Sequence, residues 1–192
     1  MYVRIADLET VFALSQVSSV VLPVRVPARQ VFDQRCVTFA LEAPSDLTVL
    51  SSSMHQVWAL RYASTLETRI SYTQSLVFGS YTRPGTSSEL EALGEVLDVE
   101  RRALMTSRAI GLTKFYNQVH DPAVHDPAIV RLRELHAQID EAVLAAYGWD
   151  DLSLGIGHHP TKIGIRWTVS PEARFELLDR LLVENHRRAA QQ

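Results

Sequence analysis

Short apolar runs separated by prolines fill the first 45 residues of the chain. Residues 20–26 and 36–41 are rich in β-branched and aromatic side chains, and Pro23, Pro27 and Pro44 interrupt the pattern. Runs of this composition are typical of strands, and the prolines mark the turns between them. The chain is therefore expected to begin with a small mixed or antiparallel sheet.

The apolar period changes after Asp46. From there to Tyr62, apolar residues recur at steps of three and four, as on one face of an α-helix, and Ser and Asp side chains are available to cap its start. We expect a helix over residues 46–62 that packs on the sheet. Its Met54 and Trp58 are expected in the core, because apolar residues at this spacing usually face inward.

From residue 86 onward the pattern is helical, and each expected helix carries an apolar stripe and a start or stop signal. The first helix follows a capping signal at 86–89 and ends near residue 106, the second covers Leu112–His120, the third begins at Asp126–Pro127 and ends at Gly148, and the fourth begins at Ser170–Pro171. The last helix is expected to bury Phe175, Leu178 and Leu182. Residues 150–169 are expected to form a loop with one short strand.

These patterns predict an α+β fold in two modules. Residues 69–85 return to strand-like alternation and end in a Pro-Gly turn signal, which places a boundary at residue 85. Residues 1–85 should form a sheet with a packed helix, and residues 86–192 an antiparallel helical tail with a short β element.

Composition narrows the class of protein. The 192 residues are 46% hydrophobic, which is enough for a substantial core. The chain contains no apolar run long enough for a membrane span, and its first residues lack the basic start and apolar centre of a signal peptide. We therefore expect a cytoplasmic protein with no membrane partner. Cys36 is the single cysteine, so an internal disulfide is excluded.

Charge is divided unevenly along the chain. The net charge is -3, which argues against non-specific coating of nucleic acid. Residues 1–87 nevertheless carry seven Arg and no Lys against six acids, whereas residues 88–192 carry twelve basic residues against sixteen acids. Guanidinium groups suit bidentate contacts to phosphate or a guanine edge. The first half is therefore the better candidate for a DNA contact, and the acidic second half for a protein contact.

Two other motifs have plainer explanations than catalysis. HDPAVHDPA (120–128) suggests a metal site, but a helix stop and a helix start explain its Asp-Pro pairs. Ser51–Ser53 with His55 suggests a nucleophile and base, yet no strand-turn-helix elbow surrounds them, and capping is the default role of such serines. The chain also lacks the Gly-rich loop and Asn-Pro-Pro-Tyr type motif that an amino-methylating methyltransferase needs.

Several segments together resemble one family. They are VFDQRCVTFAL (31–41), LTVLSSSMHQVWALRYASTLETRISYT (47–73), GLTKFYNQVHDP (111–122), IVRLRELHAQIDEAVLAAYGW (129–149) and TKIGIRWTVSPEARFELLDRLLVENH (161–186). In this order they resemble the C-terminal part of large bacterial adenine-specific DNA methyltransferases, of the type IIG restriction-modification and BREX- or DISARM-like phage-defence kind. The resemblance implies a target-recognition domain followed by a helical tail. The resembling segments begin inside the recognition module. Residues 1–85 are therefore expected to be either a complete module or one that is shortened at its N-terminal end.

The resemblance also implies partners and a set of DNA contacts. Double-stranded DNA and a methyltransferase catalytic domain or subunit are the expected partners. No cofactor is expected in this chain, and S-adenosylmethionine is expected on the catalytic domain. Arginines should contact phosphates or guanine edges, and Gln34 and Gln74 adenine edges. The full candidate set is Arg25, Arg29, Gln34, Arg61, Arg69, Tyr72, Gln74 and Arg83.

The alternative function is a protein-protein interaction or scaffold module that does not bind DNA.

Overall fold

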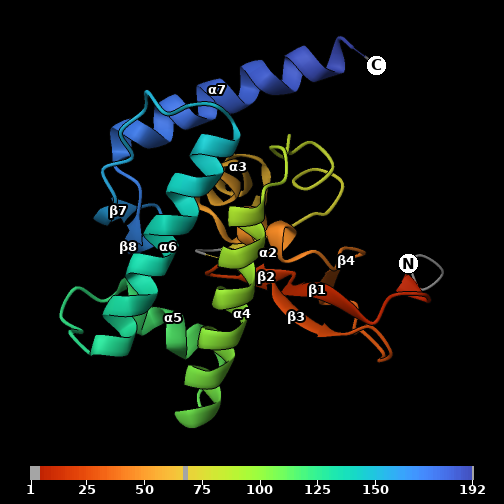
Figure 1. The fold of residues 1–192 in the computed structure, drawn as a ribbon, viewed down its shortest axis with the longest axis vertical. Coiled ribbons are helices and arrows are strands. Elements are labelled where there is room, and N and C mark those ends of the chain that lie inside the picture. The colour runs from red at the N-terminus through yellow and green to blue at the C-terminus, as the bar shows by residue number, and fades with distance from the viewer. Residues whose placement is uncertain (1–4, 67–68, 192) are drawn as a thin grey trace.

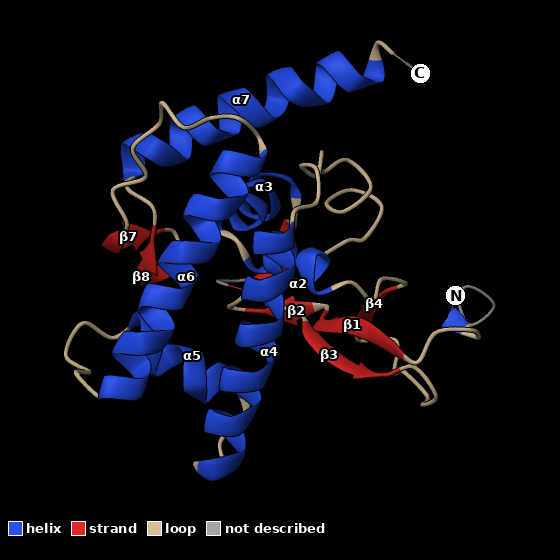
Figure 2. Cartoon of the chain, in the orientation of Figure 1, coloured by secondary structure: helices blue, strands red, loops and turns tan. Residues whose placement is uncertain are grey.

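The computed structural model describes residues 5–66 and 69–191 and has the predicted α+β class. Figure 1 follows the chain, and Figure 2 shows the strands in small groups on two sides of the helices. The strands are β1 (Thr10–Ser15), β2 (Val17–Ser18), β3 (Val24–Pro27), β4 (Cys36–Phe39), β5 (Ser64–Leu66), β6 (Arg69–Ser71), β7 (Gly157–Thr161) and β8 (Gly164–Thr168). The helices are α2 (Pro44–Ser51), α3 (Ser53–Tyr62), α4 (Ser88–Ser107), α5 (Leu112–His120), α6 (Pro127–Ala146) and α7 (Pro171–Ala189).

The strands form three small antiparallel sheets, with orders β3-β1-β4, β2-β6-β5 and β7-β8. The strand expected over residues 20–26 is shorter than predicted: β3 begins only at Val24. Pro23 has no N–H to donate to a ladder, which accounts for the late start. Val20, Val21 and Leu22 are nevertheless buried, so this segment contributes to the core as irregular chain.

The helix expected over residues 46–62 is two helices, α2 and α3, and this is a correction. Ser52 separates them with an extended backbone (φ -73°, ψ 157°). Its side chain accepts a hydrogen bond from the backbone N–H of His55 at 3.4 Å and so caps α3. A serine that bonds its own local backbone competes with helix continuation, which explains the break.

Most of the predicted signals in the second half are confirmed. Asp126 caps α6 by accepting from the N–H groups of Ala128 and Ile129, and Gly148 ends it with φ 72°. Ser87, the second residue of the predicted capping box at 86–89, caps α4. Residues 150–169 contain two strands rather than the expected one.

The buried stripe of α7 differs from the prediction. Its buried residues are Ala173, Leu177 and Leu181, whereas Phe175 is 73% exposed. Apolar residues at positions 175, 178 and 182 have the same helical spacing as the stripe that is buried. The period alone could not decide which of the two faces packs on the core.

Helices α2 and α4 approach each other closely at Gly94. A Cβ at this position would overlap the carbonyl oxygen of Pro44. Beside it, the Thr48 hydroxyl donates to the carbonyl of Leu90 at 2.6 Å, and the Ser45 N–H donates to Glu91 Oε2 at 2.8 Å. The contact joins the two predicted modules, whose buried side chains form one continuous hydrophobic cluster that includes Phe12 and Leu181. The two-module division stays a prediction.

A buried carboxylate also connects the two halves. Asp140 on α6 is 4% exposed and accepts hydrogen bonds from the backbone N–H and the hydroxyl of Ser53, both at 2.6 Å. Ser53 is the first residue of α3, where unpaired N–H groups and the helix dipole favour an anion. Burial nevertheless dominates and raises the pKa of Asp140 to about 7.

His55 lies in the core and not in an exposed catalytic arrangement. Its Nδ1 donates to the carbonyl of Leu50 at 2.7 Å, and its Nε2 therefore accepts from the hydroxyl of Tyr72 at 2.9 Å. Both ring nitrogens are thus used within the core, away from the Ser53 hydroxyl that bonds Asp140. Met54 and Trp58 are buried as predicted. Among the described residues, no helix has the length and apolarity needed to cross a bilayer.

Substitution of Gly94 by Ala should lower the free energy of unfolding by at least about 1–3 kcal/mol, because the new methyl group overlaps backbone. In an unconstrained helix interior the same change would raise stability by about 1 kcal/mol. Urea denaturation measures whether the free energy of unfolding falls or rises in the Gly94→Ala variant. Gly85→Ala, where a Cβ meets nothing within 4 Å, is the control. A stabilised Gly94→Ala variant would contradict the close contact.

Burial lowers the pKa of His55 from its usual 6.5 to about 4. The unfolded chain therefore binds a proton that the folded chain rejects, and up to about 3 kcal/mol of stability is lost as the pH falls from 6.5 to 4. The stability difference between wild type and His55→Gln should shrink over this range in urea denaturation. His125→Gln, a substitution at an exposed position, is the control variant. If the free energy of unfolding changes with pH in the same way in wild type and in His55→Gln, the lowered pKa of His55 is contradicted.

Candidate nucleic-acid interface

The structure separates the eight predicted DNA contacts into three groups. One residue, Tyr72, is buried at 1% exposure. Two arginines, Arg25 and Arg83, are ion-paired with acids of the chain. The remaining residues are exposed, and they are Arg29, Gln34, Arg61, Arg69 and Gln74.

Tyr72 is a correction to the predicted set. Its ring packs edge-on against Phe39, with centroids 6.0 Å apart, and its hydroxyl donates to His55. A side chain in this position cannot reach a DNA groove. Its aromatic character serves the core, and we withdraw it from the candidate contacts.

The charges of Arg25 and Arg83 are used within the fold. Arg25 Nη1 lies 3.1 Å from Glu95 Oε2 on α4, and its side chain is 17% exposed. Arg83 Nη1 lies 2.7 Å from Asp46 Oδ1. Burial raises the pKa of Asp46 despite the neighbouring guanidinium. The pairing makes Arg25 a structural residue, whereas Arg83, 39% exposed, keeps one side open to solvent.

Hydrogen bonds connect two of the sequence segments that hold exposed candidates. The backbone N–H of Gln16 donates to the carbonyl of Arg35 at 2.7 Å, and its own carbonyl accepts from the N–H of Tyr72 at 2.8 Å. Gln74 Nε2 donates to the carbonyl of Thr38 on β4 at 3.1 Å. The start of β4, next to Gln34, is therefore linked to the segment that follows β6.

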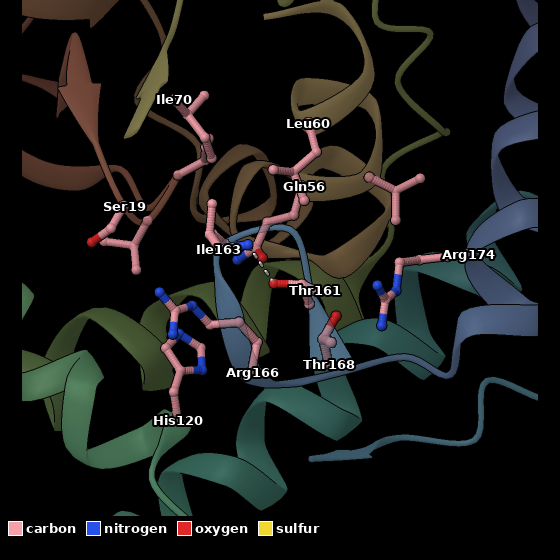
Figure 3. Close-up of a pocket in the computed structure, with 13 residues that line it drawn as sticks. Ser19, Gln56, Leu60, Ile70, His120, Thr161, Ile163, Arg166, Thr168 and Arg174 are labelled. Atoms are coloured by element: carbon pink, nitrogen blue, oxygen red, sulfur yellow. Dashed lines mark hydrogen bonds between the residues drawn. The ribbon is translucent and has the colours of Figure 1, made fainter. Parts of the chain in front are cut away.

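A second cationic surface was missed at the sequence level. The β7–β8 hairpin turns at Gly164 (φ 101°) and presents Arg166 into a cleft that it shares with α3, α5 and the start of α7. Figure 3 shows Arg166 beside His120, with Arg174 on the other side of Thr161 and Thr168. Lys162 lies at the hairpin tip, one residue from Thr161. We call Lys162, Arg166 and Arg174 the hairpin cations.

The two guanidinium groups of this cleft have no ion-pair partner within the described residues. Arg166 Nη1 donates only to its neighbour's carbonyl at 2.9 Å, and Arg174 donates to the carbonyls of Pro160 and Val169 at 3.2 and 3.3 Å. The Nε atoms of both are buried without a partner. Burial lowers the pKa of each, and for Arg174 the charge of Glu172 offsets part of this effect.

His120 lines the same cleft as a neutral ring. Its Nδ1 accepts the backbone N–H of Trp167 at 3.1 Å. Burial first, and then Arg166, lower the pKa of His120 to about 3, so the ring is neutral at pH 7. An anion at the mouth of the cleft would meet two guanidinium groups that have no ion-pair partner within the described residues. The interior of the cleft is narrow, with room for about one water molecule.

The HDPAVHDPA segment, which contains His120, has the predicted turn chemistry. Asp121 accepts from the N–H of Ala123 at 2.9 Å, and Asp126 caps α6 and pairs with Arg108 at 2.8 Å. Within the described part of the chain, no three His, Cys, Asp or Glu residues converge as metal ligands would.

Only a local signal pointed to the hairpin cations. The segment TKIGIRWT combines alternation with a glycine, which is a hairpin pattern. Its Lys162 and Arg166 form a cationic surface only together with Arg174 of the neighbouring α7. Arg174 lies twelve residues after Lys162 in the chain and in a different element. No spacing rule would have grouped the three.

Comparison with known proteins gives a likeness at the level of fold. No protein-family model and no curated protein matches the sequence. Among solved structures, the chain is similar to the type IIL restriction-modification enzyme MmeI in complex with DNA, with a TM-score of 0.63 and 15% sequence identity. The likeness covers 96% of this chain and 22% of that one. The chain therefore has the fold of one part of a restriction-modification enzyme.

Proposed function

We propose that this chain is the DNA sequence-recognition part of an adenine-specific DNA methyltransferase or of a related restriction-modification or phage-defence enzyme. The observation that carries the proposal is the fold likeness over 96% of the chain to part of a restriction-modification enzyme in complex with DNA. The resemblance of its sequence segments to the C-terminal part of adenine-specific methyltransferases supports the same function independently of the three-dimensional structure.

The distribution of unpaired cations supports a DNA-contacting face. Arg61 and the hairpin cations lie around adjoining hollows, which share Val57, Leu60, Thr161 and Arg174 as lining residues. The face therefore joins the first half of the chain to the hairpin. We assign phosphate contacts to Arg61 and the hairpin cations, because phosphate contacts set the register of a protein on a duplex.

Sequence reading is assigned to the exposed glutamines. Gln34 lies just before β4, and its side-chain amide can donate to and accept from an adenine edge at the same time. Gln74 already donates to the carbonyl of Thr38 and has one amide hydrogen fewer for DNA. Gln34 is therefore the stronger candidate of the two.

The methyl-transfer chemistry is assigned to another part of the enzyme. The chain has no methyl-donor loop or amino-methylating motif, so S-adenosylmethionine would bind the catalytic domain or subunit. With a net charge of -3 and few phosphate contacts, the chain alone should release few counterions and bind DNA weakly. The catalytic part would supply the remaining affinity.

The full chain should bind a random duplex pool more tightly at about 50 mM than at about 200 mM salt in fluorescence anisotropy. The double variant Arg166→Ala, Arg174→Ala should bind more weakly to all sequences and lower the salt slope by about 2, because each lost phosphate contact lowers it by about 1. Arg131→Ala is the matched control, since Arg131 pairs with Glu100 elsewhere on the helices. Absence of salt-dependent binding to any duplex would overturn the proposal in favour of a scaffold module.

Gln34→Ala should change which sequences are selected from the pool and leave the salt slope unchanged. Loss of one paired amide contact should reduce discrimination at a single base pair by about 1–3 kcal/mol. Sequencing of the bound fraction measures the change. Gln30→Ala, an exposed glutamine in the same β3–β4 connection, is the control. An unaltered preference in Gln34→Ala would remove this residue from the reading set.

A further inference from the structure

Helix α7 carries apolar side chains on two faces. The first face holds Ala173, Leu177 and Leu181 and is buried in the core. The second holds Phe175, which is 73% exposed, and Leu178, which is partly buried. A single exposed apolar residue needs no explanation, but an exposed Phe on the same wall as a Leu marks a surface that excludes water when covered.

This second face forms one wall of a groove. The opposite wall is α3, through Val57 and Leu60, and Pro171 closes the groove at the start of α7. Figure 1 shows α3 and α7 as neighbours, with the β7–β8 hairpin near the start of α7. The groove has about 840 Å³ of empty space including its open mouth. We call it the α3–α7 groove.

The rim of the α3–α7 groove is positively charged. Arg61 from α3, Lys162 from the hairpin and Arg174 from α7 line it. No carboxylate lines it within the described part of the chain, although the whole chain has a net charge of -3. An apolar floor with a cationic rim is therefore a local feature and not a consequence of composition.

We propose that the α3–α7 groove binds a protein segment that presents aliphatic side chains flanked by carboxylates. An apolar centre that holds an aromatic anchor, surrounded by a charged rim, is the usual construction of a protein interface. The rim cations complement acids on the incoming segment, which favours encounter and fixes orientation.

Duplex DNA fits this groove less well than a protein segment does. Protein contacts to a duplex go mainly to phosphate and sugar, and these would engage the rim but leave Phe175 and Leu178 facing water. The apolar floor of the groove is therefore not part of the proposed DNA contacts, whereas Arg61, Lys162 and Arg174 on its rim belong to both proposed surfaces. The proposal does not depend on the DNA-recognition function.

Three short synthetic helical peptides, used with the full chain in fluorescence anisotropy, test the proposal. The first carries Leu at helical spacing with Glu at the flanks, the second replaces each Glu by Lys, and the third replaces each Leu by Ser. The first should bind at least about tenfold more tightly than either of the others, since both the apolar and the charged contacts contribute. Equal binding of all three, or no binding, would overturn the proposal.

Two variants locate the binding site on the chain. Phe175→Ala and Lys162→Glu should each weaken binding of the first peptide by about tenfold or more, because Phe175 is the apolar anchor and Lys162 part of the rim. Val183→Ala is the control, since Val183 is 69% exposed on the same helix but does not line the groove. Equal unfolding midpoints exclude a folding defect.

Two further outcomes would assign the groove to another occupant. If Phe175→Ala weakens binding to the duplex pool and not to the peptide, the groove belongs to DNA and the docking proposal fails. If it instead converts a dimer of the chain into a monomer in sedimentation, a second copy is the occupant and the proposal fails as well. Peptide binding without any DNA binding would overturn the proposed function and leave the docking site in place.

Discussion

The close approach of α2 and α4 at Gly94 is the contact on which the arrangement of the whole chain depends. Two helices can bring backbone against backbone only where one of them has no side chain, and the carbonyl of Pro44 occupies the space that a Cβ would need. The Thr48 hydroxyl and the Glu91 carboxylate bond across the same contact. Arg25 adds an ion pair from β3 to α4. The sheet and the helices consequently share one core.

This packing uses much of the positive charge of the chain internally. Arg25, Arg83, Arg102 and Arg108 all pair with acids of neighbouring elements or turns. Ion pairing in the fold removes these groups from any competition for phosphate. Arg166 on the β7–β8 hairpin and Arg174 at the start of α7 have no ion-pair partner among the described residues, and for this reason the proposed DNA face is centred there.

Helix α7 links the two proposed surfaces. Its first turns supply Arg174 to both the cationic cleft and the rim of the α3–α7 groove, and Phe175 to the groove alone. The same helix buries Leu177 in the core. A helix with two apolar faces can pack one face on the core and offer the other as a docking surface. A helix with a single apolar face uses that face in the core.

The sequence by itself determined the features that depend on local chemistry. The α+β class, the caps at Asp126 and Ser170, the stop at Gly148 and the burial of Met54 and Trp58 follow from period and capping, because these act within a few residues of chain. Gln34 and Arg61 are exposed, and their role as DNA contacts stays a prediction.

Only the tertiary structure decided features that require contact between distant segments. It connected Ser53, the first residue of α3, to Asp140, 87 residues away. It also placed Tyr72 against His55, paired Arg25 with α4, and chose the Leu177 face of α7 over the Phe175 face. Period and composition are properties of neighbouring residues, whereas burial, ion pairing and the choice between two similar faces depend on what packs against them.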